Sequence, residues 1–250
     1  MFSFAKGFSD CLSGFGLILQ SGVKRYVIIP LVVNIVLFAG AVSALADQVD
    51  SWIQQLLPGW LSWLEWLILP LFYIAMLLVI FYTFTLVANL IASPFNSYLS
   101  SRVEANLTGV KPVDMSTDKL LKLAGRTIAA ELRKIVYSIK WMIPLAILSF
   151  IPVVNVIAPF AWILFAIWFF ALEYTDYPLA NRGQLFDEVK KYNQKNRMRS
   201  LGLGSGIFLL TSIPVINFIA MPVAVAAATR LTVKVREGGN PQPVNGPVDG

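Results

Sequence analysis

The stretch IPVVNVIAPF, residues Ile151–Phe160, returns almost unchanged as IPVINFIAMP at Ile213–Pro222. Each copy places two prolines and one asparagine inside an otherwise apolar run. Proline interrupts a helix because it lacks an N–H group and its ring clashes with the preceding turn, and an asparagine side chain can hydrogen-bond to the backbone groups that are left free. We therefore expect two similar helical hairpins, each turning at one copy of the motif.

The chain around these motifs has the composition of an integral membrane protein. Of its 250 residues, 57% are hydrophobic and only 14% are charged, whereas about 25% are charged in an average soluble domain. There is no histidine, and Cys11 is the single cysteine. Metal-dependent or Ser-His catalysis is therefore not expected. The sequence predicts neither an enzyme nor a bound cofactor or metal.

Two segments are long and apolar enough to cross a hydrocarbon core of about 30 Å, which takes about 20 helical residues. They run from about Tyr26 to Ala46 and from about Trp66 to Ile91. Acidic residues but no Lys or Arg lie between them, and basic residues flank them on their outer sides. Because positive charge is retained in the cytoplasm, we expect the N-terminus, the chain after Ile91 and the C-terminus to be cytoplasmic.

The two motif copies lie in apolar stretches of about Trp141–Leu172 and Leu201–Leu231. One crossing each would place the basic segment between them outside, against the charge rule. Two crossings each would leave about 15 residues per helix, roughly 22 Å, which is too short. The sequence therefore predicts an all-α integral membrane protein with two long transmembrane helices and two re-entrant, partly penetrating hairpins of half-length helices. Pro-kinked helices that only fill space between the spans are the alternative.

Amphipathic cytoplasmic helices complete the predicted fold. In the first 20 residues one apolar face is formed by Phe4, Phe8, Leu12, Phe15 and Leu19. This face suits a helix lying on the membrane surface, and equally an ordinary helix packed on the rest of the protein.

A second amphipathic helix is expected from Ser116 to about Met142. Breaks are expected before it, at Pro94, Gly109 and Pro112. Residues 1–235 are predicted to form a single membrane-embedded domain, and residues 236–250 a polar tail rich in Gly and Pro.

Four stretches give the chain a likeness to a known family: SGVKRYVIIPLVVN from Ser21, IASPFNSYLSSRVEANLTG from Ile91, LEYTDYPLANRGQLF from Leu172 and TSIPVINFIAMPVAVAAATRL from Thr211. Over about Phe8–Val235 the sequence resembles the CysZ family of bacterial sulfate permeases. The resemblance implies a protein of the bacterial inner membrane that admits sulfate for cysteine biosynthesis. It also implies two long transmembrane helices and two partly inserted hairpins.

The resemblance places the family's sulfate-binding motif on Gly22, Val23, Lys24 and Arg25. Lys24 stands where arginine is common, so the bidentate contact is expected from Arg25. Independently, this loop opens the first span, where free N–H groups and the helix dipole favour an anion. A basic pair before a span also serves simply as a topological anchor.

Seven further polar residues are candidates for pore or gating positions: Asn34, Arg102, Glu104, Asn155, Glu173, Asp176 and Asn217. Proton coupling would need the carboxylates among them, since the chain has no histidine. Glu173 and Asp176 could instead cap helices or pair with Arg182 or Arg230.

Sulfate and membrane lipid are the expected partners, together with further copies of this chain in a homo-oligomer, and no nucleic acid. A channel and a gradient-coupled permease both fit, since there is no GxxxxGK[ST] loop for ATP. The alternatives are transport of another oxyanion, such as thiosulfate, selenate or molybdate, and a membrane scaffold without transport activity.

Overall fold

A computed structural model of the protein describes residues 2–56, 64–112 and 117–238. Within several helices, including residues 45–56, 80–94 and 117–132, the described part is the backbone alone. In chain order the helices are α1 (Phe2–Ile18), α2 (Arg25–Leu56), α3 (Glu65–Thr108), α4 (Thr117–Phe150), the short 3-10 helix η2 (Val154–Ile157), α5 (Ala158–Ala180), α6 (Phe186–Lys195), α7 (Arg197–Ser212) and α8 (Pro214–Gly238). The chain divides into two compact units, Arg25–Phe95 and Met1–Lys24 with Asn96–Gly250.

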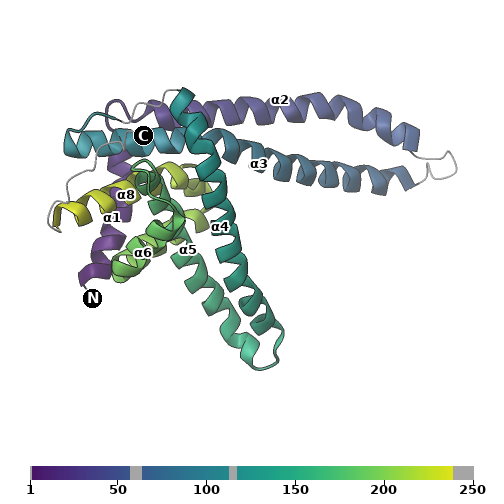
Figure 1. The fold of residues 1–250 in the computed structure, drawn as a ribbon. Coiled ribbons are helices and arrows are strands. Elements are labelled where there is room, and N and C mark those ends of the chain that lie inside the picture. The colour runs from purple at the N-terminus through teal and green to yellow at the C-terminus, as the bar shows by residue number, and fades with distance from the viewer. Residues whose placement is uncertain (1, 57–63, 113–116, 239–250) are drawn as a thin grey trace. The chain divides into compact units, whose positions relative to one another are not determined.

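The unit Arg25–Phe95 contains α2 and most of α3, which are two long helices (Figure 1). Residues Arg25–Ala44 are long and apolar enough to cross a membrane, as predicted. Apolar side chains such as Ile35, Val36 and Leu71 are more than half exposed, which suits contact with lipid better than with water. In the second predicted span Leu69–Val79 is a shorter apolar helix. That span stays a prediction, because the side chains of residues 80–94 lie outside the described part.

Helix α3 continues through Pro94 to Thr108, so the break predicted at Pro94 is wrong. A proline removes one backbone hydrogen bond, and the helix continues on both sides of that position. The break predicted at Gly109 is confirmed, because Gly109 follows the last helical residue with φ 72°. The helix predicted from Ser116 is also confirmed as α4, which runs two turns beyond Met142.

Helices α4 and α5 form a hairpin that turns at the first motif copy (Figure 1). Near the turn, Trp162 Nε1 donates to Ser149 Oγ at 3.2 Å. Further from it, Lys134 Nζ donates to Asp176 Oδ2 at 2.8 Å. Residue numbers therefore fall along α4 as they rise along α5, as in an antiparallel pair.

Helices α7 and α8 form the second hairpin. Asp10 of α1 contacts both Arg199, near the start of α7, and Lys234, near the end of α8. The two far ends of this pair therefore meet, and the chain reverses at Ile213, which separates the two helices. The duplicated motif thus marks a helix reversal in both places.

Helix α7, with 16 residues, has about the predicted half length, whereas the limbs α4, α5 and α8 are longer than predicted. Helix α5 has 23 residues, or about 34 Å at 1.5 Å per residue, and Val154–Ala180 is long and apolar enough to cross a membrane. The prediction ended this limb at its first charged residues. Glu173 and Asp176 instead lie inside α5, where Lys134 of α4 pairs with both.

Helix α1 packs on α7 and α8 through small residues, so the alternative of an ordinary packed helix is confirmed. Its buried stripe is Gly7, Asp10, Cys11, Gly14, Leu17 and Ile18. At Gly7 and Gly202 the backbone of the facing helix lies where a Cβ atom would be. The predicted apolar face is not the buried one, since Leu12 and Leu19 are exposed.

Gly202→Ala is expected to destabilise the protein because its Cβ atom would overlap the backbone of α1 at Phe4 and Phe8. Overpacking of this kind costs about 1–3 kcal/mol, and each kcal/mol lowers the Tm by roughly 2–4 °C in a protein of this size. Thermal unfolding in detergent, followed by circular dichroism, measures the shift. Gly16→Ala is the matched control, since nothing lies within 4 Å of its new Cβ atom. Equal Tm values for the two variants would contradict this packing.

Candidate anion site and its charged neighbourhood

The loop between α1 and α2 contains the predicted anion motif and is a tight turn. The Gln20 carbonyl oxygen accepts the N–H groups of Val23 at 3.1 Å and Lys24 at 3.4 Å. Gly22 has φ 80°, a conformation that glycine adopts without a steric penalty. Val23 is fully buried and anchors the loop, whereas Gly22 and Lys24 are exposed. The turn therefore presents the glycine backbone and a lysine side chain outward.

Arg25 is the first residue of α2 and is exposed. Its guanidinium lies over the ring of Tyr26, 5.0 Å from the centroid, an arrangement that holds the planar group by cation–π attraction. Within the described part of the chain the Arg25 side chain has no ion pair, so its N–H groups are available. The first turn of α2 adds backbone N–H groups that have no partner within the helix. These groups are the donors that suit an oxyanion.

A buried carboxylate organises the neighbouring helices. Asp10 is 2% exposed, and its Oδ2 atom accepts from Arg199 Nη2 at 2.7 Å and Nε at 3.2 Å. Its Oδ1 atom accepts from Lys234 Nζ at 2.6 Å, with Arg230 Nε 4.0 Å away. One negative charge therefore faces three positive charges, and the cluster joins α1, α7 and α8.

A second carboxylate, Glu104 near the end of α3, plays a similar part. Its Oε1 atom accepts from Arg182 Nη2 at 2.9 Å and from Arg236 Nη1 at 3.1 Å. Glu104 was predicted as a pore or gating residue, and in the structure it joins the end of α3 to the loop after α5 and to α8. Arg102 is half-buried on the same helix.

The third cluster contains Glu173 and Asp176, also predicted as pore or gating residues. Both pair with the buried Lys134, at 3.1 and 2.8 Å. The predicted pairing with Arg182 or Arg230 is wrong, because those residues face Glu104 and Asp10. Lys134 of α4 was missed as their partner, because the residues that face each other in a hairpin depend on the register of its two helices.

The remaining candidates lie apart from these clusters. Asn155 and Asn217 are exposed at the two hairpin turns, where their backbone N–H groups bond to the carbonyl oxygens of Ile151 and Ile213. Over the described residues neither side-chain amide has a hydrogen-bond partner, so the predicted bonding of these side chains to free backbone groups is wrong. Asn34 lies in α2, and its side chain is outside the described part.

Two prolines of the motif also differ from the prediction. Pro159 is the second residue of α5, and Pro222 lies inside α8. Proline fits the first turn of a helix because no hydrogen bond is lost there. The helix breaks therefore fall at the start of each motif copy and not at its second proline.

Asp10 and its partners were missed, although the sequence contains one signal for Asp10. It is the sole acidic residue before Asp47, and it lies on the stripe of Gly7, Cys11 and Gly14 at helical spacing. An acidic residue on a buried stripe requires a partner of opposite charge. The sequence does not indicate which basic residues reach Asp10, because Arg199 and Lys234 lie 189 and 224 residues away along the chain.

Long apolar helices, exposed apolar surfaces and polar residues gathered into buried ion clusters define a helical membrane protein. Its basic loop at a helix start exposes hydrogen-bond donors and positive charge. The chain belongs to the family described as Sulfate transporter CysZ/Etoposide-induced protein 2.4, whose model matches residues 10–222. The resemblance to the CysZ family is thereby confirmed.

Curated relatives match along nearly the whole chain. The sulfate transporter CysZ of Pseudomonas syringae pv. tomato is 43% identical over 227 residues, covering 89% of this chain and 90% of the relative. The sulfate transporter CysZ of Pseudomonas fluorescens is 38% identical over 231 residues, covering 91% and 92%. That of Pseudomonas aeruginosa is 38% identical over 225 residues, covering 88% and 92%. The relatives bear the names of transporters and not of enzymes.

Proposed function

We propose that this chain transports sulfate across the bacterial inner membrane and so supplies sulfur for cysteine biosynthesis. The observation that carries the proposal is the likeness to sulfate transporters over about nine tenths of the chain. The exposed basic loop at the start of α2 supports it. Sulfate is a strongly hydrated dianion, so its entry requires donors and positive charge in place of water.

Gly22, Val23, Lys24 and Arg25 are the proposed sulfate site. The turn exposes the backbone at Gly22, buried Val23 fixes the loop, and the side chains of Lys24 and Arg25 supply the positive charge. Arg25 supplies the directional contact, because a guanidinium can donate two parallel hydrogen bonds to an oxyanion. The Tyr26 ring supports the guanidinium on one face and leaves its N–H edge available.

The hairpin tips are proposed to lie inside the membrane without reaching its far side. The tip of the first hairpin is strongly apolar, with Phe150 and Val153 both 86% exposed. Its one polar side chain, Asn155, is exposed beside them. An exposed apolar tip requires a cover of lipid or of a second copy of the chain. In this arrangement both termini are cytoplasmic, and a homo-oligomer encloses the polar route.

Uptake of radiolabelled sulfate into liposomes that contain only this protein tests the function. We expect uptake above that of protein-free liposomes, and competition by unlabelled sulfate. Stronger competition by thiosulfate, selenate or molybdate would assign another oxyanion as the substrate. Liposomes with correctly inserted protein and no flux of any of these anions would leave the scaffold alternative.

Thiol labelling tests the depth of the hairpin tips. In a Cys11→Ala background, Asn155→Cys and Asn217→Cys are expected to resist a bulky impermeant reagent added from the periplasmic side. Cys11→Ala removes the single cysteine of the native chain, so labelling reports only the introduced cysteine. Asp50→Cys is the positive control, since it lies between the two predicted spans, and Gln194→Cys is the cytoplasmic one.

Ready labelling at both tips would mean full crossings and would contradict the re-entrant arrangement. The assay is decisive because α5 alone is long enough to cross. Labelling at Gln194→Cys from the periplasmic side would contradict the proposed orientation.

A further inference from the structure

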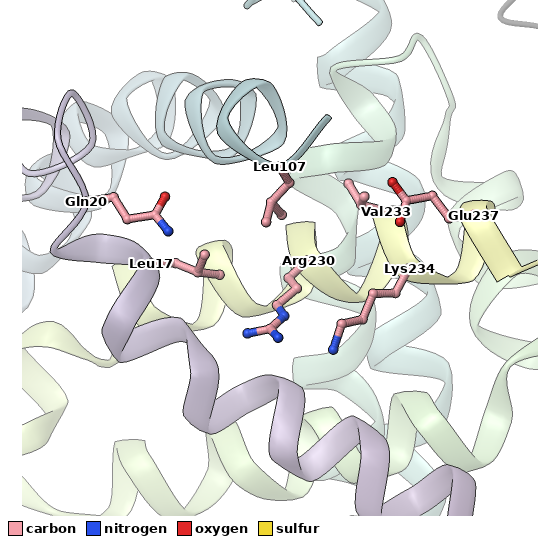
Figure 2. Close-up of a pocket in the computed structure, with 7 residues that line it drawn as sticks. All are labelled: Leu17, Gln20, Leu107, Arg230, Val233, Lys234 and Glu237. Carbon is pink, nitrogen blue, oxygen red and sulfur yellow. The ribbon is translucent and has the colours of Figure 1, made fainter. Parts of the chain in front are cut away.

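A cleft of about 360 Å³ lies in the unit that contains α1 and α8 (Figure 2). It is lined by Leu17, Gln20, Leu107, Arg230, Val233, Lys234 and Glu237. Since a water molecule takes up about 30 Å³ of the liquid, this cleft has room for a small anion with part of its hydration shell. None of its lining residues was predicted as a site residue.

The polar groups of the cleft are mostly hydrogen-bond donors. Arg230 and Lys234 are four residues apart and extend from the same face of α8, as Figure 2 shows. The guanidinium of Arg230 comes no closer than 4.0 Å to Asp10, and among the described residues it has no hydrogen-bond partner. Lys234 uses one of its three N–H groups on Asp10.

Gln20 adds an amide donor from the opposite side of the cleft. Its Oε1 atom accepts a hydrogen bond from Asn106 Nδ2 at 3.1 Å. This contact uses the acceptor of the Gln20 amide, so its two N–H groups are left to donate to a ligand. Gln20 also shapes the anion loop through its carbonyl oxygen.

The charge balance also favours an anion. Asp10 supplies one negative charge to Arg199, Arg230 and Lys234. Glu237 at the cleft adds a second negative charge and, within the described part of the chain, makes no ion pair with them. One positive charge is left uncompensated, and the free donors point to a ligand that only accepts hydrogen bonds.

We propose that this cleft, whose lining does not include Arg25, binds a free tetrahedral oxyanion of the sulfate class as a second subsite. The proposal rests on the proposed function, since it names a second place where the transported anion is held. A lipid phosphate has the same acceptor geometry, so the test separates the two sources.

Equilibrium binding of radiolabelled sulfate to the purified full-length chain tests the cleft. Arg25→Ala weakens the loop site, and we expect this variant still to bind sulfate. Adding Arg230→Met to it should lower the remaining sulfate affinity about tenfold or more. Arg230 is the weakest partner of Asp10, so its replacement leaves the Asp10–Arg199 pair intact. Arg25→Ala/Arg197→Met is the matched control. It also replaces an arginine by methionine, but Arg197 is an exposed residue of α7 that does not line the cleft. It should bind as Arg25→Ala does.

The proposal is overturned if Arg25→Ala abolishes all sulfate binding, or if Arg230→Met and Arg197→Met have equal effects. Repeating the measurement with phosphatidylglycerol in the micelles separates free anion from lipid. Sulfate binding at the cleft should persist, and its displacement by the lipid would overturn the assignment to a free anion. If liposomes with the wild-type protein take up sulfate while the cleft fails these tests, the proposed function is retained and the cleft proposal is rejected. No uptake by the wild type would instead remove the proposed function.

Discussion

Asp10→Asn is expected to be strongly destabilising, with a cost of about 3 kcal/mol, at the low end of the range for breaking a buried ion pair. The substitution keeps the shape of the side chain and removes the charge that compensates Arg199 and Lys234. The low end applies because the Lys234 side chain is 42% exposed and can be partly hydrated. With about 2–4 °C per kcal/mol, the Tm should fall by roughly 6–12 °C. Circular dichroism in detergent measures it.

Asp187→Asn is the matched control for Asp10→Asn. Asp187 pairs with Arg133 at 2.9 Å, a distance similar to that of the Asp10 pairs, yet their side chains are 61% and 58% exposed. Exposed pairs contribute only about 0–1 kcal/mol. We therefore expect a Tm change of no more than about 4 °C. If the two variants shift the Tm equally, burial of the Asp10 carboxylate is not what stabilises the junction of α1, α7 and α8.

The duplicated motif allowed the helix reversals to be predicted because proline acts locally. Pro152 and Pro214 each lie two residues after the last residue of a helix, Phe150 in the first copy and Ser212 in the second. The helix-breaking effect of a proline depends only on the few residues around it. The second prolines were misjudged for the same local reason. A proline ends a helix only where a preceding turn already exists, and Pro159 falls in the first turn of α5, where no hydrogen bond is at stake.

The length of the α5 limb could not be predicted from its apolar run. A charged residue ends a membrane segment only if nothing neutralises it, and Glu173 and Asp176 are neutralised by Lys134 from a neighbouring helix. Likewise, the face of α1 that packs inward was misjudged because glycine scores as neither apolar nor polar. Close approach of helices at Gly7 and Gly202 depends on backbone contact and not on hydrophobicity.

The candidate anion loop is the part of the site that the sequence predicts best, since a glycine and two basic residues are contiguous at a helix start. The ion clusters at Asp10 and Glu104 are less accessible to such reasoning. Their members come from three segments each, and the choice among the chain's 20 Lys and Arg residues is made by the packing of the helices.

Arg25→Ala is expected to weaken sulfate binding at the loop by roughly ten- to hundredfold, because it removes a hydrogen-bond donor that carries a charge. Arg25→Lys should recover only part of this loss, since it restores the charge without the planar pair of donors. Lys24→Arg should bind sulfate as well as the wild type or more tightly. Calorimetry with sulfate on purified, folded variants measures these affinities, and the Arg230→Met background removes the contribution of the cleft.

The same series separates a binding site from a topological anchor. An anchor acts during insertion, where lysine and arginine are equivalent. On that alternative Arg25→Lys would have no effect, and Arg25→Ala would lower the yield of inserted protein while the affinity per folded chain stayed unchanged. Equal affinities of the wild type and Arg25→Ala would therefore contradict the assignment of the loop as the sulfate site, even if sulfate uptake into liposomes were intact. Partial recovery by Arg25→Lys at unchanged yield is a result that only the binding site explains, because it depends on the geometry of the guanidinium and not on its charge.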